Sequence, residues 1–262
     1  MEKCIDSFDG TRIFYYDNQL KSDKVAVFLH GWAGNRTHWK GHFDFFTNKG
    51  FRVIAPDFRG FGKSDCPKEE EKYSFKNDAK DINEILIKEK ISNACFLGFS
   101  MGGMIALTFS SSFPEKASSL VFAMSGHKGP LQNQKLKNYA FKLTNMARKH
   151  PFKKINTKEV DFYKDNYAIS TIKEVLSESS TMGVIVSLEN ILNFDFSKNI
   201  GKISVPALII AGAKDGMMPK KISKEMQSLL KQSQYVEVNY DHFFIVKHPD
   251  VSSLIILDFL EK

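Results

Sequence analysis

Cysteine and long apolar runs are scarce in this 262-residue chain, and each shortage excludes a class of protein. The three cysteines, Cys4, Cys66 and Cys95, are odd in number and far apart, so they indicate neither a disulfide framework nor a zinc site. No apolar run approaches the roughly 18 residues that a membrane-spanning helix needs. The first ten residues lack the apolar stretch of a signal peptide. We therefore expect an intracellular, cytoplasmic protein without a transmembrane segment.

Acidic residues are absent from residues 127–158, a stretch that holds nine Lys and Arg residues. The net charge of +7 therefore arises in this segment. A basic surface here would attract an anionic substrate, an acidic acyl carrier protein or a membrane surface. The simpler interpretation is a solvated face in a lysine-rich chain. No recognised nucleic-acid-binding motif accompanies the segment, so we expect no nucleic-acid partner.

Strand and helix patterns alternate through two parts of the chain. The opening segments KCIDSF and TRIFYYD flank Asp9-Gly10, which predicts a hairpin with a two-residue turn. Alternating buried strands and helices are typical of a mostly parallel sheet with helices on both faces, so the predicted fold class is α/β. Short apolar runs predict strands at 24–30, 51–56, 94–99, 118–124, 204–212 and 234–239, and helical spacing predicts helices at 36–49, 77–90, 101–113, 220–230 and 250–260.

The alternation breaks between about Ser125 and Lys202, where no buried strand is evident. We predict one main domain formed by residues 1–124 and 203–262, with residues 125–202 inserted as a helical cap. The inserted segment reads as several helices, including an amphipathic one through Leu136, Tyr139, Ala140, Leu143, Met146 and Ala147.

One serine stands between glycines where a predicted strand gives way to a helix, in FLGFSMGGM (96–104). The G-x-S-x-G pattern is weak alone, but a strand before it and a helix after it are the setting of an exposed nucleophile. Side chains at positions 98 and 102 would collide across so sharp a turn. The N–H groups that begin the helix favour developing negative charge. The alternative is a glycine-bounded turn in which Ser100 is incidental.

A serine nucleophile needs a base, and the base needs an orienting acid. In parallel-sheet proteins such groups gather beyond the carboxyl ends of the strands. His242 follows the strand at 234–239, and Asp215 follows the strand at 204–212. The strand at 118–124 is followed by no carboxylate. The predicted order is Ser100, Asp215, His242.

Two further histidines, His38 and His42, are spaced as a metal-binding pair on a predicted helix. No third ligand accompanies them, so we expect surface histidines and no metal site.

Five segments match a known pattern in chain order. They are HGWAG (30–34), DFRGFGKSD (57–65), GFSMGG (98–103), AGAKDGMMP (211–219) and DHFFIVKHPDVSSLIILDFL (241–260). Together they resemble the oxyanion loop, a D-x-R-G-x-G-x-S loop, the nucleophile turn, the acid turn and the histidine loop of the α/β-hydrolase superfamily. The resemblance is to carboxylesterase-like serine hydrolases with a helical cap, and it covers nearly the whole main domain.

The resemblance implies that Ser100 is the nucleophile, His242 the general base and acid, and Asp215 its orienter. It also implies a mostly parallel central sheet with an inserted helical cap. Relatives usually place Gly before the histidine, where this chain has Asp241. A carboxylate there would either raise the pKa of the histidine or face solvent.

The oxyanion donors implied by the resemblance are the backbone N–H groups of Trp32 and Met101. The side chains of Trp32 and Phe99 are expected to contact the substrate. Three residues of the 57–65 loop are expected to hold that loop by hydrogen bonds and charge pairing: Asp57, Arg59 and Ser64.

The implied activity is hydrolysis of a small-molecule carboxylic ester through an acyl-enzyme, with no cofactor or metal. Serine at position 100 argues against haloalkane dehalogenase or epoxide hydrolase chemistry, which uses a carboxylate nucleophile in this fold. Thioesterase, lactonase and C–C bond hydrolase activities are alternatives within the superfamily. A non-catalytic ligand receptor on the same fold is the alternative from another class.

Overall fold

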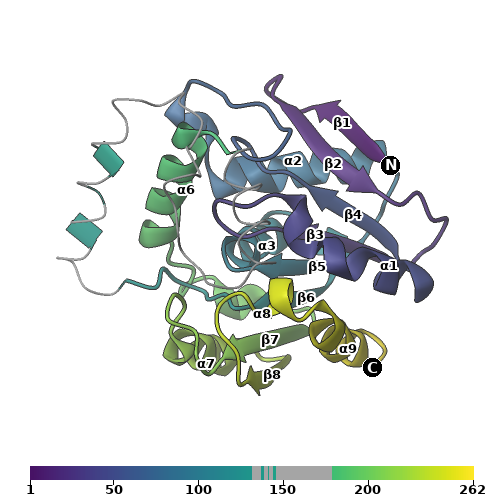
Figure 1. Cartoon of the computed structure of the whole chain (residues 1–262), viewed down its shortest axis with the longest axis vertical. Helices are drawn as coiled ribbons and strands as arrows, with labels where there is room; N and C mark the ends of the chain where they lie inside the picture. The colour runs from purple at the N-terminus through teal and green to yellow at the C-terminus, as the bar shows by residue number, and fades with distance from the viewer. Residues whose placement is uncertain (132–136, 139–140, 142–143, 146–178) are drawn as a thin grey trace.

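The computed structural model describes residues 1–131, 137–138, 141, 144–145 and 179–262 (Figure 1). The predicted amphipathic helix and most of the basic segment lie outside the described residues.

An eight-stranded sheet runs through the described part of the chain in the order β1-β2-β4-β3-β5-β6-β7-β8. Neighbouring strands are parallel from β4 to β8, whereas β1 and β2 form the antiparallel hairpin at one edge. The strands are β1 Glu2–Asp6, β2 Arg12–Asp17, β3 Val25–Leu29, β4 Arg52–Pro56, β5 Ala94–Phe99, β6 Ala117–Ala123, β7 Ala207–Gly212 and β8 Ser233–Val238.

Helices cover both faces of the sheet (Figure 1). The side chains of α2, α3 and α7 join one buried apolar cluster, and those of α1, α8 and α9 join a second. The helices are α1 Lys40–Asn48, α2 Phe75–Lys88, α3 Met101–Ser112, α6 Thr181–Asn193, α7 Lys220–Leu229, α8 Phe244–Lys247 and α9 Pro249–Leu260, with 3-10 turns η1 Arg36–Trp39, η2 Glu70–Lys72, η3 Pro114–Lys116 and η5 Ile200–Lys202.

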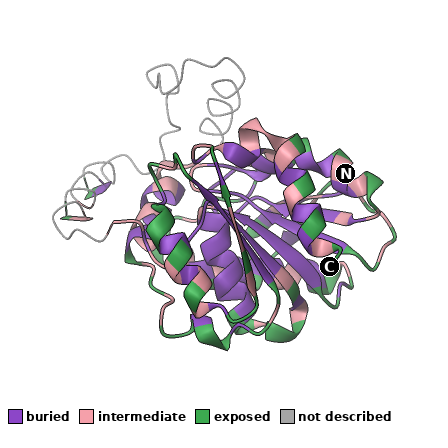
Figure 2. Ribbon diagram, turned by 90° about the horizontal axis from the view of Figure 1, so that it is seen from below, coloured by how far each residue is buried: buried purple, intermediate pink, exposed green. Residues whose placement is uncertain are grey.

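The central strands are buried on both faces, which explains their unbroken apolar sequences. In β3, Val27 contributes to the first cluster and Phe28 to the second, because successive side chains of a strand point to opposite faces. Figure 2 shows the sheet as a buried layer, with exposed residues on the outer sides of the helices. The α/β prediction is confirmed.

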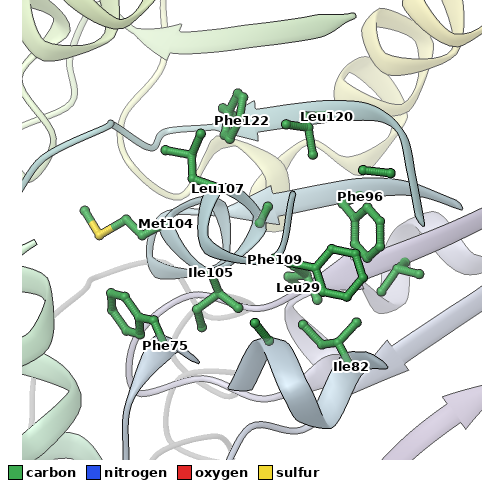
Figure 3. Packing of buried hydrophobic residues seen from close by; sticks show 14 of the residues in the cluster. Leu29, Phe75, Ile82, Phe96, Met104, Ile105, Leu107, Phe109, Leu120 and Phe122 are labelled. Atoms are coloured by element: carbon green, nitrogen blue, oxygen red, sulfur yellow. The ribbon is translucent and has the colours of Figure 1, made fainter. Parts of the chain in front are cut away.

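Helix α3, which begins beside Ser100, is buried along ten of its twelve residues. Its side chains Ile105 and Phe109 lie among residues of β5, β6 and α2 (Figure 3). A helix that is apolar on all sides belongs in the interior of a domain. The serine turn therefore rests on a well-packed helix.

The predicted hairpin forms, but the prediction of a two-residue turn is wrong. Asp6 pairs with Arg12, so five residues connect the strands. Asp9 stabilises this wider loop, since its carboxylate accepts hydrogen bonds from the Thr11 N–H at 3.1 Å and from Arg59 at 2.7 Å.

Among the described residues, none of the helices is both long enough and apolar enough to cross a membrane. The cytoplasmic location stays a prediction.

His38 and His42 are buried, so the expectation of surface histidines is wrong. The His42 Nε2 lies 2.8 Å from the Ser252 Oγ, which joins α1 to α9. A Cβ on Gly41 would lie 2.8 Å from the ring of Pro249, so the two helices approach closely there. Burial lowers the pKa of His42 from 6.5 to about 3, and the neutral imidazole is compatible with an apolar interior.

The replacement His42→Gln tests this burial through the pH dependence of stability. Below pH 6.5 the unfolded chain binds a proton at His42 that the folded chain excludes, so the wild type loses stability as the pH falls towards 3. We expect His42→Gln to lack this component, which amounts to about 1.4 kcal/mol per pH unit. The measurement is the free energy of unfolding in urea at several values between pH 6 and pH 4.

Burial raises the pKa of three carboxyl groups, those of Asp57, Asp78 and Asp81. These groups affect the wild type and His42→Gln alike, so their effects cancel in the difference between the two free energies of unfolding. Two parallel curves of stability against pH would show that His42 is not held neutral.

Candidate active site

Ser100 lies between β5 and α3 with φ 52° and ψ −115°, a backbone conformation that is strained for any residue but glycine. Residues at the end of β6 bind both backbone polar groups of Ser100. The Ser100 N–H donates to the Ala123 carbonyl at 2.9 Å, and the Ser125 hydroxyl donates to the Ser100 carbonyl at 2.7 Å. Sequence reasoning missed Ser125, because it considered only carboxylates at this strand end.

Glycine is required at positions 98 and 102 for different reasons. A Cβ on Gly98 would collide with the backbone of Gly102 and Gly103 across the turn, as predicted. A Cβ on Gly102 would instead collide with the carbonyl oxygens of Leu29 and His30, at the end of β3. The start of α3 therefore lies directly against the loop that follows β3.

The structure brings Ser100, His242 and Asp215 together. The His242 Nε2 lies 3.0 Å from the Ser100 Oγ, and its Nδ1 lies 2.8 Å from the Asp215 Oδ2. Asp215 is fixed in turn by the backbone N–H groups of Met217 and Met218, which both donate to its Oδ1 at 2.8 Å. An ionised carboxylate only accepts hydrogen bonds, so His242 carries its proton on Nδ1 and its Nε2 is able to accept the serine proton.

Asp241 turns away from the histidine that it precedes. Its carboxylate accepts hydrogen bonds from Lys247 Nζ at 2.7 Å and from the Phe243 N–H at 3.0 Å. Partial burial opposes ionisation, but Lys247 and the Phe243 N–H outweigh it, so the pKa of Asp241 is lowered. Asp241 therefore takes part in an ion pair beside the site.

The loop after β3 holds the peptide that links Gly31 to Trp32. The Gly31 carbonyl accepts hydrogen bonds from the Gly34 N–H at 3.2 Å and from His30 Nδ1 at 2.8 Å. His30 Nε2 accepts from the Phe58 N–H at 3.0 Å, which fixes the tautomer with the proton on Nδ1. Because a trans peptide is planar, the Trp32 N–H points away from the Gly31 carbonyl.

The other predicted donor, the N–H of Met101, belongs to the first residue of α3 and has no carbonyl partner within that helix.

His38 supports the same loop and was also missed by sequence reasoning. Its Nδ1 lies 3.3 Å from the Gly31 N and accepts its N–H, and Gly34 is closely packed on its ring. Burial is the larger cause and the nearby charge of His242 the smaller one, and together they lower the pKa of His38 to about 4. The neutral ring is therefore available as a hydrogen-bond acceptor near pH 7.

The predicted substrate contacts, Trp32 and Phe99, occupy different surroundings. The Trp32 indole N–H donates to the Val184 carbonyl of α6 at 2.8 Å. Phe99 is buried, and its ring centroid lies 5.3 Å from that of His242 and 5.4 Å from that of His38. Phe99 thus packs beside the His242 imidazole, and its contact with a substrate stays a prediction.

The structure confirms the hydrogen bonds and charge pairing expected of the 57–65 loop. Asp57 accepts from the Arg36 side chain at 2.6 Å, and Ser64 Oγ donates to the Asp57 carbonyl at 2.7 Å. Arg59 is buried and pairs with Asp81 at 2.6 Å. The partners Arg36 and Asp81 carried no sequence signal, because each is distant in the chain from the residue it binds.

Among the described residues, no group of three or more His, Cys, Asp or Glu side chains is arranged to hold a metal ion.

Residues 25–249 match the family model of the alpha/beta hydrolase fold. The chain belongs to the α/β-hydrolase family. One relative is a pimeloyl-[acyl-carrier protein] methyl ester esterase of Wigglesworthia glossinidia brevipalpis, 27% identical over 90% of this chain and 93% of that protein. Another is a 2-hydroxy-6-oxononadienedioate/2-hydroxy-6-oxononatrienedioate hydrolase of Burkholderia vietnamiensis, 26% identical over 97% of this chain and 93% of that protein.

A solved structure has the same fold. An esterase from Exiguobacterium antarcticum aligns over 100% of both chains with a TM-score of 0.85 at 24% identity. This similarity confirms the fold, and the resemblance seen in the sequence motifs is confirmed at the level of the superfamily.

The replacement Gly98→Ala tests the packing of the serine turn. A Cβ at this position meets backbone atoms, which have little freedom to move, so we expect a loss of about 1–3 kcal/mol of stability. The matched control is Gly201→Ala, because a Cβ on Gly201 meets nothing within 4 Å. Urea denaturation compares the two, and equal stabilities would contradict the close packing at Gly98.

Proposed function

We propose that this protein is a serine hydrolase that cleaves a small-molecule carboxylic ester. The observation that carries the proposal is the continuous hydrogen-bond chain from Ser100 Oγ through His242 to Asp215. A serine held in a strained conformation at the start of a buried helix is the second support, because such strain persists only where the surroundings enforce it.

In the proposed reaction, Ser100 Oγ attacks the ester carbonyl carbon while His242 Nε2 takes the serine proton. The carbonyl oxygen becomes an oxyanion, and the N–H groups of Trp32 and Met101 stabilise it. His242 then gives its proton to the leaving alcohol as the C–O bond breaks, which leaves an acyl group on Ser100. Water then attacks the acyl carbonyl carbon while His242 takes its proton. His242 returns this proton to Ser100 Oγ as the bond between the acyl carbon and Oγ breaks, which releases the acid and regenerates Ser100.

Asp215 holds His242 in the required tautomer and stabilises the imidazolium that forms. The proposal invokes no cofactor or metal ion, because every proton transfer in it uses side chains and the substrate's own leaving group.

The names of the relatives support ester hydrolysis and one alternative. One relative is an esterase of an acyl carrier protein methyl ester, whereas the other hydrolyses a 2-hydroxy-6-oxo dioate. Hydrolysis of a C–C bond in a substrate of the latter kind is therefore the second candidate. An anionic or acyl carrier protein-bound substrate would suit the basic segment 127–158, which lies mostly outside the described residues.

The first test measures turnover of p-nitrophenyl esters from acetate to palmitate, with the wild type and Ser100→Ala. We expect kcat to fall by at least about 10⁴-fold in the variant, because the nucleophile is removed. The chain length with the highest kcat/KM measures the depth of the pocket.

Equal turnover by both proteins would refute the role of Ser100. Turnover confined to thioesters, lactones or vinylogous diketones would replace the ester proposal by another reaction of the same fold. Stoichiometric binding without any turnover would identify a ligand receptor.

The replacement Asp215→Asn tests the orienting role of the carboxylate. Asn retains an oxygen for the Met217 and Met218 N–H groups, but its amide N–H₂ would face His242 Nδ1 and favour the wrong tautomer. We expect kcat to fall by about 10⁴-fold with little change in stability. Asp241→Asn is the matched control, and an equal loss of kcat in both variants would contradict the assignment.

A further inference from the structure

Helix α6 is joined to the candidate oxyanion loop by one hydrogen bond that spans 152 residues of sequence. The Trp32 indole N–H donates to the Val184 carbonyl at 2.8 Å. Trp32 follows β3 in the main domain, whereas Val184 belongs to the predicted cap segment. The residue whose backbone N–H is proposed to bind the oxyanion is therefore tied by its side chain to α6.

The N-terminal end of α6 is clamped to the 57–65 loop by two glycines that face each other. A Cβ on Gly183 would lie 2.9 Å from the Cα and the carbonyl oxygen of Gly60, so only glycine allows this approach. The Ser180 N–H donates to the Gly60 carbonyl at 2.8 Å, and the Ser180 hydroxyl accepts from the Gly183 N–H at 2.9 Å. Val184 is the next residue, so this clamp determines where its carbonyl lies.

The rest of α6 is anchored as well. The Asn190 side chain donates to the Tyr73 carbonyl at 2.6 Å, and Met182 and Val186 form a buried cluster with Tyr73. Figure 1 shows α6 beside η2, the turn that Tyr73 follows. The helix is therefore held firmly enough to fix the position of a side chain bound to it.

The oxyanion loop needs such a restraint, because Ala33 adopts φ 53° next to Trp32. A non-glycine residue in this region costs free energy, which the surrounding contacts must offset. Hydrogen bonds of His30, His38 and Gly34 restrain the loop on the side of Gly31. On the side of Trp32 the indole adds a restraint from α6.

We propose that α6 is a positioning element for the oxyanion hole. The Val184 carbonyl fixes the Trp32 indole, and the contact of Gly183 with Gly60 sets the position of that carbonyl. The indole thereby holds the Trp32 end of the Gly31–Trp32 peptide, whose carbonyl end is already held by hydrogen bonds, and the two restraints together fix the direction of the Trp32 backbone N–H. This inference rests on the proposed hydrolase function. It makes the predicted cap segment a part of the machinery that stabilises the transition state.

The contact is observable by NMR because the chain has only two tryptophans. The second, Trp39, is buried and donates its indole N–H to the Leu29 carbonyl at 2.9 Å, so its signal is an internal reference. In Gly183→Ala the new Cβ pushes α6 away from Gly60 and weakens the bond to Trp32. We expect the Trp32 indole signal to shift and its hydrogen exchange to accelerate about tenfold, with the Trp39 signal unchanged.

Ester hydrolysis measures the consequence for catalysis. Complete loss of an oxyanion donor costs about 10²–10³ in kcat, so a donor that is only misplaced should cost roughly tenfold, with KM nearly unchanged. Trp32→Phe, which keeps a ring but lacks the N–H donor, should show the same pattern. The double variant should lose little more than either single one, because both remove the same interaction.

The matched control is Gly201→Ala in η5, where the added Cβ meets nothing within 4 Å. Both indole signals and kcat should then equal those of the wild type. An unchanged Trp32 indole signal in Gly183→Ala would overturn the inference, and so would a shifted signal with unchanged kcat. Neither result would affect the proposed function. Fully additive losses in the double variant would also overturn it.

If the wild type shows no turnover, or if its turnover survives in Ser100→Ala, the proposed function is contradicted. The inference then fails as well, because it rests on that function. The failures are therefore distinguishable, since the Ser100 comparison does not involve α6.

Discussion

The strained backbone of Ser100 is the constraint on which the rest of the site depends. Hydrogen bonds at and just beyond the end of β6 support its positive φ, because the Ala123 carbonyl accepts its N–H and the Ser125 hydroxyl donates to its carbonyl. The glycines around it allow β5, α3 and the end of β3 to meet closely. The serine turn is thus built by the packing of three parallel strands and one buried helix.

Neutral histidines form hydrogen bonds in the interior of the protein. His30 donates through one ring nitrogen and accepts through the other, and His38 accepts the Gly31 N–H. Burial lowers the pKa of His30 to about 3 and that of His38 to about 4. Both rings therefore keep the fixed donor and acceptor pattern that restrains the loop bearing Trp32.

The strands and helices of the main domain could be predicted because their signals are local. The bounds of β5 and α3, for example, follow from an apolar run, two glycines and Pro114. The meeting of Ser100, Asp215 and His242 could be predicted because parallel strands bring their carboxyl ends to one edge of the sheet.

Other features could not be predicted, because they depend on contacts between distant segments. The Trp32 bond to Val184, the facing glycines 60 and 183 and the burial of His42 have no local pattern. The hairpin turn was predicted too short, because the wider loop depends on the distant Arg59. The division into a main domain and a cap at residues 125–202 stays a prediction, although α6 packs against the main domain.

The contact between α1 and α9 has a consequence for how the chain acquires its fold. His42 and Ser252, which join the two helices, are 210 residues apart in sequence. During synthesis, the apolar cluster that α1 and α9 share stays incomplete until α9 has left the ribosome. Contacts of such long range form slowly and leave apolar surface open to aggregation meanwhile. This face of the sheet is therefore completed only when α9 docks against α1.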